Sequence, residues 1–279
     1  MNFSIIVVCL NPGEKLNQTL DSIFAQSCRD YEIIIKDGGS TDGSVDAWLK
    51  AWRKRKAEPS ETVHLYQEQD TGIYDAMNQA VSHARGEFLL FLNCGDTFAD
   101  QYVLERTREG IKARAASGAD ISRMVLYGDT YGEKNQVVIA SPPVINGFVC
   151  YRNIPCHQSC FYSAALCREK PFDLQYRIRA DYDHFLWCYY RAGAQMFHMG
   201  FAVASYEGGG YSESRKNRRR DRKEHSLIIH TYMGKGELLR YKVIMALTLA
   251  PLRRALADSK VFSGVYHRMK ERAYSTYRT

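Results

Sequence analysis

The sequence predicts an α/β protein with a Rossmann-like, mostly parallel sheet that is flanked by helices. Two observations support this class. Strands are expected at residues 4–9, 31–36 and 88–92, and the last is a continuous apolar run, which is typical of a parallel strand buried on both faces. Between these strands, apolar residues recur every three or four positions, as they do in amphipathic helices. Strands that alternate with helices at short intervals indicate a parallel sheet covered on both sides.

The central unit of this pattern covers residues 69–98. Apolar residues between positions 73 and 84 predict a helix that Gly86 closes, and a buried strand follows at 88–92. Turn residues and short apolar runs between 128 and 160 predict hairpins and loops over one edge of the sheet. The other strands are expected at 4–9, 31–36, 63–66, 124–127 and 195–204, and the other helices at 16–24, 44–55, 101–117, from 163, 184–191 and 224–233.

Two acidic turns follow predicted strands. The segment DGGSTDGS, residues 37–44, comes directly after strand 31–36, and NCGD, residues 93–96, comes after strand 88–92. Because ligands of open α/β sheets bind just beyond the C-terminal ends of the strands, we expect both turns at a ligand site. Glycines let the backbone approach a ligand closely, and a carboxylate such as that of Asp96 suits a hard divalent cation.

Length and charge divide the chain. The 279 residues suffice for one large domain or for a domain with an appendage. The net charge of +7 is concentrated after residue 210, where three consecutive glycines predict a flexible joint. We therefore expect a domain at 1–210 and a helical, basic and amphipathic extension at 211–279, whose charge suggests an anionic partner.

A cytoplasmic location is expected. The first residues, MNFSIIVVCLN, lack the basic start and small-residue cleavage site of a signal peptide. No apolar stretch approaches the roughly 20 residues that span a bilayer. The eight cysteines are scattered and include no CxxC pair, which indicates free thiols in a reducing compartment.

Six motifs lie in order over about residues 3–210. They are SIIVVCLN, KDGGSTDGS, QDTGIYDAMNQAV, GEFLLFLNCGD, PCHQSCFY and RADYDHFLW. Together they resemble the family 2 glycosyltransferases of bacterial surface-polysaccharide synthesis, which have the GT-A fold. The resemblance implies an inverting transfer of a sugar from a nucleotide-diphosphate sugar, of the UDP or GDP type, helped by Mn²⁺ or Mg²⁺.

The resemblance also assigns residues to the nucleotide and the metal. Asp37 matches the first acidic residue after the second strand, which contacts the base of the nucleotide. Asp96 matches the last acid of the DXD-type motif and is the expected metal ligand. Asn93 or Cys94 is expected to touch the ribose, and Asp70 either faces the nucleotide or caps the helix that follows it.

The chain departs from the family pattern at four positions. Gly38 stands in place of the second acid of the usual DDGS turn, so one polar contact is expected to be lost. Asn93 and Gly95 stand where carboxylates are usual, so the diphosphate is expected to supply further oxygens to the metal. Ala180 replaces the glutamate of the family's Glu-Asp motif.

Asp181 aligns with the aspartate of that Glu-Asp motif and is the expected general base. Asp183, two residues on, is the competing candidate, with an acceptor-side role as an alternative, and either aspartate could instead cap the helix that follows. His157 in PCHQSCFY is expected either as a structural histidine or as a contact to the acceptor or the diphosphate. Tyr74 is expected to pack rather than to take part in chemistry.

The run RKNRRRDRK, residues 215–223, leaves three interpretations open. It is a solvated face, a nucleic-acid contact, or a contact to anionic lipid or a lipid-diphosphate acceptor, in which Arg215 and Arg218 take part. No base-stacking or groove-reading motif accompanies it, so we expect no nucleic acid and favour the lipid. The apolar segment 238–252 with flanking cations fits a helix in the membrane interface, an oligomer contact, or packing on the domain.

The sequence thus predicts a metal-dependent, inverting hexosyl- or N-acetylhexosaminyl-transferase of family 2, peripheral on the inner face of the cell membrane. Its expected acceptor is a polyprenyl-diphosphate-linked saccharide in polysaccharide assembly, and a homo-oligomer is compatible with the tail. The alternatives are a transferase with a soluble or protein acceptor, and a non-catalytic nucleotide-sugar or lipid-binding protein on the same scaffold.

Overall fold

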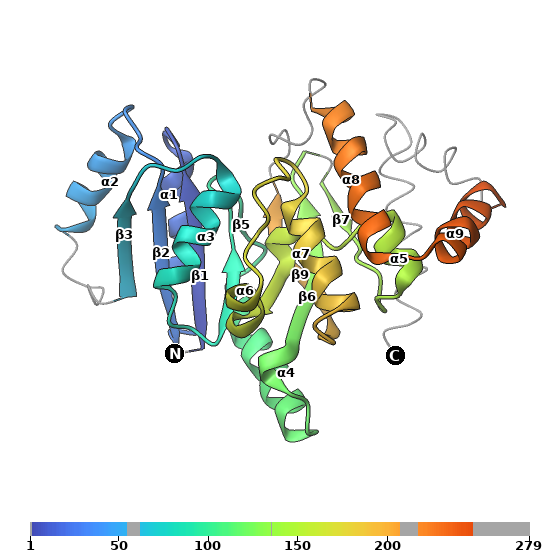
Figure 1. Cartoon of the computed structure of the whole chain (residues 1–279). Helices are drawn as coiled ribbons and strands as arrows, with labels where there is room; N and C mark the ends of the chain where they lie inside the picture. The colour runs from blue at the N-terminus through green and yellow to red at the C-terminus, as the bar shows by residue number, and fades with distance from the viewer. Residues whose placement is uncertain (1, 55–61, 135, 207–216, 248–279) are drawn as a thin grey trace.

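A computed structural model describes residues 2–54, 62–134, 136–206 and 217–247. Within these residues the strands form one sheet in the order β3-β2-β1-β4-β8-β6-β9-β5, with β7 paired to β6 (Figure 1). Helices cover both faces of the sheet, so the α/β class with its flanking helices is confirmed.

The first half of the sheet is parallel. Strand β1 pairs with β2 and with β4 in parallel register, and β2 pairs with β3 in the same way. Every residue of β1, β2 and β4 is buried, which explains why apolar residues predominate in these strands. The elements of this half are β1 (Phe3–Cys9), α1 (Lys15–Phe24), β2 (Tyr31–Asp37), α2 (Ser44–Trp52), β3 (Val63–Gln67), α3 (Ile73–His83) and β4 (Phe88–Phe91).

The second half is mixed, because β8 runs antiparallel to both of its neighbours, β4 and β6. The expected hairpins after residue 128 are present as β6 and β7, and the late strand is a single long one. The elements are β5 (Thr97–Phe98), α4 (Val103–Ala116), η2 (Ile121–Arg123), β6 (Met124–Gly132), β7 (Val137–Ile139), α5 (Gly147–Arg152), η3 (His157–Ser159), β8 (Cys160–Ser163), α6 (Ala164–Glu169), α7 (Ala180–Tyr190) and β9 (Gln195–Tyr206).

Gly86 has a different role from the predicted one. Helix α3 ends at His83, and its C-cap is Ala84 in an extended conformation. A β-carbon at position 86 would lie 2.5 Å from the backbone nitrogen of Ser4. Glycine is therefore needed there for the close approach of the chain to β1, not for ending the helix.

Two further helices follow β9: α8 (Arg218–Tyr232) packs on α7, and α9 (Lys235–Leu247) packs on α5 and α8 (Figure 1). Ile228 and Ile229 of α8 and Leu238 and Tyr241 of α9 are buried in the same apolar cluster as α7. The predicted joint at residue 210 lies outside the described residues. Among the described helices, none has the length and apolarity needed to cross a bilayer.

Candidate active site

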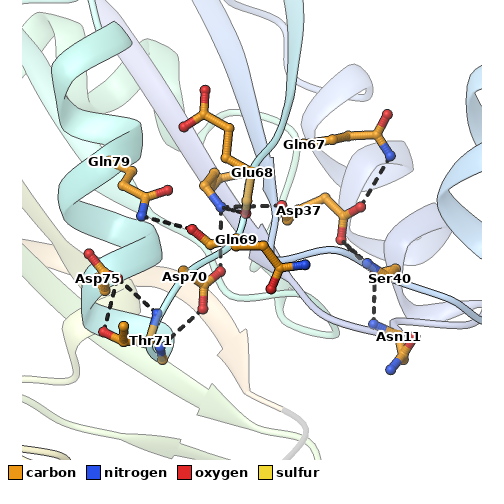
Figure 2. Close-up of polar contacts among 12 residues, drawn as sticks. Asn11, Asp37, Ser40, Gln67, Glu68, Gln69, Asp70, Thr71, Asp75 and Gln79 are labelled. Carbon is orange, nitrogen blue, oxygen red and sulfur yellow. Dashed lines mark hydrogen bonds and ion pairs between the residues drawn. The ribbon is translucent and has the colours of Figure 1, made fainter.

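The turn after β2 is tightly hydrogen-bonded (Figure 2). The Asp37 carboxylate accepts from the amide and the hydroxyl of Ser40 through Oδ1, at 3.0 and 2.6 Å. Its Oδ2 accepts from the side-chain amide nitrogen Nε2 of Gln67 at 3.2 Å. Asp37 is fully buried, so a ligand reaches this carboxylate only when the exposed Gln67 side chain moves aside.

A buried ammonium group lies beneath this turn. Lys36 has no exposed surface, and its Nζ donates to the carbonyl oxygens of Glu68 and Asp37 at 2.6 and 3.2 Å. It also pairs with Asp70 Oδ2 at 3.4 Å. Because a buried cation is costly unless it is paired and hydrogen-bonded, Lys36 ties the end of β2 to the loop that precedes α3.

The Asp70 carboxylate lies against the backbone of Gly38. A β-carbon at position 38 would be 2.5 Å from Asp70 Oδ2, closer than any non-bonded carbon can sit. The other oxygen, Oδ1, accepts from the amide of Gly72 at 3.0 Å (Figure 2). The missing acid at position 38 therefore leaves room for an acid that comes from the β3–α3 loop.

The acidic turn after β4 brings Asp96 to the same edge of the sheet. The side chain is 5% exposed, and its Oδ2 accepts from Gln158 Nε2 at 2.8 Å. The backbone is fixed by Thr19, whose hydroxyl donates to the carbonyl of Asp96 and accepts from the amide of Gly95, both at 2.8 Å. Gln158 in turn accepts from the thiol of Cys156 at 2.8 Å.

Asp181 is the second residue of α7 and is half-buried. The Tyr74 hydroxyl, from α3, lies 2.8 Å from Asp181 Oδ1 and 2.7 Å from the carbonyl oxygen of Ile178. Burial and the nearby charge of Asp181 raise the pKa of Tyr74 well above its usual value, so the hydroxyl keeps its proton. Tyr74 therefore contacts one of the predicted site residues directly.

Asp183 points into the protein instead. It is 3% exposed, pairs with Lys170 at 2.5 Å and accepts from the Tyr232 hydroxyl at 3.0 Å. These contacts join α7 to the end of α6 and to α8. Both of its oxygens are thus used for packing contacts, in contrast to those of Asp181.

His157 directly precedes Gln158, the partner of Asp96. Its ring stacks on Phe91 with centroids 5.1 Å apart and meets Phe172 edge-on at 5.8 Å. Burial lowers its pKa, an effect that the charge of Asp181 opposes in part, so the imidazole is neutral. Neither ring nitrogen has a hydrogen-bond partner among the described residues.

The start of α7 is fixed by the C-terminal helix α8. The buried Glu224 carboxylate accepts from the backbone amides of Arg177, Ile178 and Arg179 at 3.1, 2.9 and 3.0 Å. Arg179 also pairs with Asp221 of α8 at 2.7 Å. The segment that carries Asp181 is therefore held by residues more than 40 positions later in the chain.

Of the two arginines predicted at the acceptor, Arg218 is exposed at the first turn of α8. Arg215 lies outside the described residues. The exposed side chains that follow on α8 include Arg219, Arg220 and Arg222.

Comparison with known proteins identifies the chain. The family model described as "Glycosyl transferase family 2" matches residues 4–169, which is more than half of the sequence. The chain belongs to glycosyl transferase family 2. The PGL/p-HBAD biosynthesis glycosyltransferase of Mycobacterium tuberculosis is 34% identical to this glycosyltransferase over 215 residues, which cover 76% of this chain and 79% of that protein.

Solved structures show the fold of this glycosyltransferase. TarS 1–349 of S. aureus, in complex with UDP-GlcNAc, superposes with a TM-score of 0.63 at 18% identity, over 94% of this chain and 74% of that one. The chain covers 44% of full-length TarS. The mannosyltransferase PcManGT from Pyrobaculum calidifontis, in complex with GDP-Man and Mn²⁺, gives a TM-score of 0.59 at 16% identity, over 97% and 86% of the two chains. The expected GT-A fold is confirmed.

The residues of this glycosyltransferase fit a divalent cation at the turn after β4. Asn93 Oδ1 is buried without a hydrogen-bond partner among the described residues, three positions before Asp96. An amide oxygen and a carboxylate are ligands that hard cations accept. The described residues include no group of three or more His, Cys, Asp or Glu side chains that could hold a metal, so further oxygens would have to come from the diphosphate. Burial raises the pKa of the neighbouring Cys94 thiol to about 12.

Four functional contacts of this glycosyltransferase were not expected from the sequence. Gln158 follows His157 in the PCHQSCFY motif, which was its only signal. Tyr74 is spaced like a packing residue, and Lys36 occupies an otherwise apolar strand. Glu224 lies far from its backbone partners in the sequence, and no local pattern indicates it.

Proposed function

We propose that this enzyme moves a hexosyl or N-acetylhexosaminyl group from a UDP- or GDP-sugar to a hydroxyl of a polyprenyl-diphosphate-linked saccharide, with inversion. The observation that carries the proposal is the position of segment 156–158. Gln158 contacts Asp96 at 2.8 Å. The ring of the neighbouring His157 packs on Phe172 with centroids 5.8 Å apart, and Phe172 packs on Tyr74, whose hydroxyl contacts Asp181. One short segment thus connects the surroundings of the two carboxylates.

This arrangement supports a direct displacement. A diphosphate at the Asp96 turn directs the anomeric carbon of its sugar toward Asp181. Asp181 removes the proton from the acceptor hydroxyl, and the hydroxyl oxygen forms the new bond to the anomeric carbon. The bond to the diphosphate oxygen breaks on the opposite face, and the nucleotide diphosphate leaves with the electron pair, which inverts the configuration.

Each remaining predicted residue has a place in this scheme. Asp37, exposed by movement of Gln67, accepts from the N–H of the base, and Asp70 lies beside it for the nucleoside. Asn93 and Asp96 would hold Mn²⁺ or Mg²⁺, and Cys94 lies next to them in the ribose region. A bound cation neutralises the charge that develops on the leaving diphosphate.

The comparisons support the donor class. TarS is described in complex with UDP-GlcNAc, and PcManGT in complex with GDP-Man and Mn²⁺. The mycobacterial relative is named for the biosynthesis of PGL/p-HBAD. We extend from these names to a nucleotide-sugar donor, a divalent cation and a cell-surface glycan acceptor in this enzyme.

The surface of α8 and α9 supports a location at the inner face of the cell membrane. Arginines are exposed along the first turns of α8, and Leu239, Val243 and Leu247 are 64%, 48% and 79% exposed on α9. Residues four positions apart lie on one face of a helix, so these three form an apolar stripe. Near an anionic bilayer each Lys or Arg is worth about 1 kcal/mol. His157 and Arg218 are placed on the acceptor side in this scheme, as is Arg215.

A nucleotide panel tests the donor. Thermal unfolding is measured with UDP, GDP, ADP and CMP, each with and without Mn²⁺. A ligand that binds only the folded state raises stability by RT ln(1 + [L]/Kd), so a metal-dependent shift is expected with UDP or GDP alone. Asp96→Asn should lose the metal dependence. Absence of any shift would favour a non-catalytic protein on the same scaffold.

Replacement of the base tests the mechanism. Asp181→Asn is expected to lower turnover by about 10²–10⁴-fold while the nucleotide shift persists, because general-base catalysis contributes about that much. Asp183→Asn is the matched control: it loses contacts to Lys170 and Tyr232, so stability falls, but the folded enzyme should turn over normally. Equal turnover losses in the two variants would refute the assignment of Asp181.

Vesicle sedimentation tests the location. The full chain should sediment with phosphatidylglycerol vesicles and not with phosphatidylcholine vesicles. Arg219→Glu/Arg220→Glu should abolish this, whereas Lys50→Glu/Lys112→Glu, the same charge change at exposed sites of α2 and α4, should not. If the wild type does not sediment with either kind of vesicle, or if the wild type and both double variants sediment equally, the membrane would be removed from the proposal.

A further inference from the structure

The hydroxyl of Tyr74 has one hydrogen and two acceptors. Its oxygen lies 2.7 Å from the carbonyl oxygen of Ile178 and 2.8 Å from Asp181 Oδ1. The carbonyl can only accept, whereas a carboxyl group accepts when it is charged and donates when it carries a proton. These groups therefore have two hydrogen-bond arrangements. When Asp181 is charged, the single Tyr74 hydrogen serves one of the two acceptors; when Oδ1 carries a proton, both contacts hold a hydrogen.

We propose that Tyr74 is the positioning residue of the base and reverses its hydrogen bond to Asp181 during the transfer. Before the reaction the Tyr74 hydroxyl donates to the charged carboxylate. Asp181 then takes the proton of the acceptor hydroxyl. If this proton settles on Oδ1, the protonated Asp181 carboxyl donates to the Tyr74 oxygen. The Tyr74 hydrogen then turns to the carbonyl of Ile178. No proton leaves Tyr74 in this exchange. The inference rests on the proposed role of Asp181.

The surroundings of Tyr74 hold its oxygen in place. Its ring packs against Phe172 with centroids 5.6 Å apart, and α3 carries it on the helix that starts beside Asp70. The Ile178 amide is fixed from the other side by Glu224 at 2.9 Å. Both acceptors of the hydroxyl thus belong to a segment whose position is set by α8. A hydroxyl between two fixed acceptors orients the Asp181 carboxylate without a water molecule.

Packing alone would also place a tyrosine here, so the test keeps the ring. Tyr74→Phe removes only the hydroxyl. Tyr31→Phe is the matched control, because the buried Tyr31 hydroxyl also donates to a backbone carbonyl, that of Ile23. Tyr31 belongs to a different apolar cluster from the α7 residues on either side of Asp181. Any effect common to the two variants reflects the loss of a buried hydroxyl rather than a role in the transfer.

Release of nucleotide diphosphate is measured on the full chain with UDP-GlcNAc, UDP-glucose and GDP-mannose, each with Mn²⁺. For Tyr74→Phe we expect kcat to fall about 10–100-fold with the KM for the nucleotide sugar unchanged, as for the loss of a contact that matters only in the transition state. Tyr31→Phe should match the wild type in both kcat and KM.

Two further results separate the inference from the proposed function. In an Asp181→Asn background, Tyr74→Phe should cost no further turnover, and equal losses in both backgrounds would overturn the inference. If the wild type releases no nucleotide from any donor, the proposed function fails. The inference is then judged by urea unfolding of Tyr74→Phe, Asp181→Ala and the double variant. Losses that add fully show no contact between the two side chains and overturn it; losses that fall short of additivity support the contact.

Discussion

The two halves of the sheet assemble their polar edges in different ways. In the parallel half, the contacts of Asp37 and Asp70 come from residues 36–72, that is, from β2, β3 and the turns that follow these two strands. In the mixed half, the segment around Asp181 is held by Tyr74 from α3 and by Glu224 from α8. One edge is thus local in the chain, and the other is built from distant contacts.

This difference separates two properties of the enzyme. Under the roles proposed above, nucleotide binding depends on turns that directly follow their strands, so it should tolerate damage to the C-terminal helices. Transfer would depend on the start of α7, which α8 fixes through three backbone hydrogen bonds. Changes in the mixed half are therefore expected to affect turnover and stability, and changes in the parallel half to affect nucleotide affinity.

The largest effect is expected for Glu224→Ala, which removes the contacts that hold the start of α7 in the mixed half. The variant leaves three amides without their acceptor, and hydrogen bonds to a charged group contribute about 1.5–3 kcal/mol each, so a loss of about 3–5 kcal/mol is expected after relaxation. Urea unfolding measures it. Glu237→Ala on α9 is the control, because its carboxylate accepts from Tyr190 at the end of α7 and from Tyr241, and not from the backbone at the start of α7.

The nucleotide shift of Glu224→Ala decides whether the two halves are separate. At a temperature where circular dichroism shows the variant folded, transfer should be lost and the UDP or GDP shift retained. Loss of both together would mean that α8 supports the whole sheet and that the contrast between the halves does not hold.

A smaller effect is expected from acid, and it should originate in the mixed half. Burial, with the charge of Lys170 as a second cause, lowers the pKa of His184 from 6.5 to about 3. Between these values the unfolded chain binds a proton that the folded chain excludes, so stability falls as the pH drops below 6.5. The loss is about 1.4 kcal/mol per pH unit, or about 2 kcal/mol at pH 5.

Urea unfolding between pH 7 and 5 checks this slope. His184→Met should reduce it, leaving the part that the buried His157 contributes, since burial lowers its pKa as well. His230→Gln, at an exposed position of α8, should leave the slope as in the wild type. A slope that His184→Met does not change would place the acid sensitivity elsewhere.

The smallest effect is expected for Gly38→Ala, which tests the parallel half of the sheet. The added carbon displaces the Asp70 carboxylate and weakens its pairing with Lys36. Nucleotide affinity should fall about tenfold, equivalent to about 1.4 kcal/mol, with kcat at saturation unchanged. Calorimetric titration measures the affinity. Gly234→Ala, where a β-carbon meets open space, is the control, and equal affinities in the two variants would contradict the role of Asp70.

The sequence predicted the parallel half well because its information is local. A strand fixes the position of the residue that follows it, so the sequence alone predicts that the turns at 37–44 and 93–96 lie on one edge of the sheet. The alternation of apolar runs and helical periods likewise predicted the order of elements. Family resemblance added Asp181, which no spacing would have singled out.

The remaining contacts could not be predicted, and the reasons differ. Tyr74 has the spacing of a packing residue, and only its hydroxyl distinguishes its role. Gly38 indicated a lost acid, whereas the space beside it is filled by Asp70 from a different loop. Glu224 is one of several charged residues in a basic helix, and its partners lie 45–47 positions away. Contacts of this kind have no signature in a single sequence.

The dependence of α7 on Glu224 also orders events during synthesis on the ribosome. Chains grow from the N-terminus at about 5–20 residues per second, and domains form as their residues emerge. Strands β1 to β4 are complete by residue 91, whereas the anchor of the α7 segment follows some 130 residues later. Under the roles proposed above, a nascent chain has its nucleotide-binding turns well before Asp181 is held in position, and a chain that stops ahead of α8 would lack the Glu224 contacts that fix the start of α7.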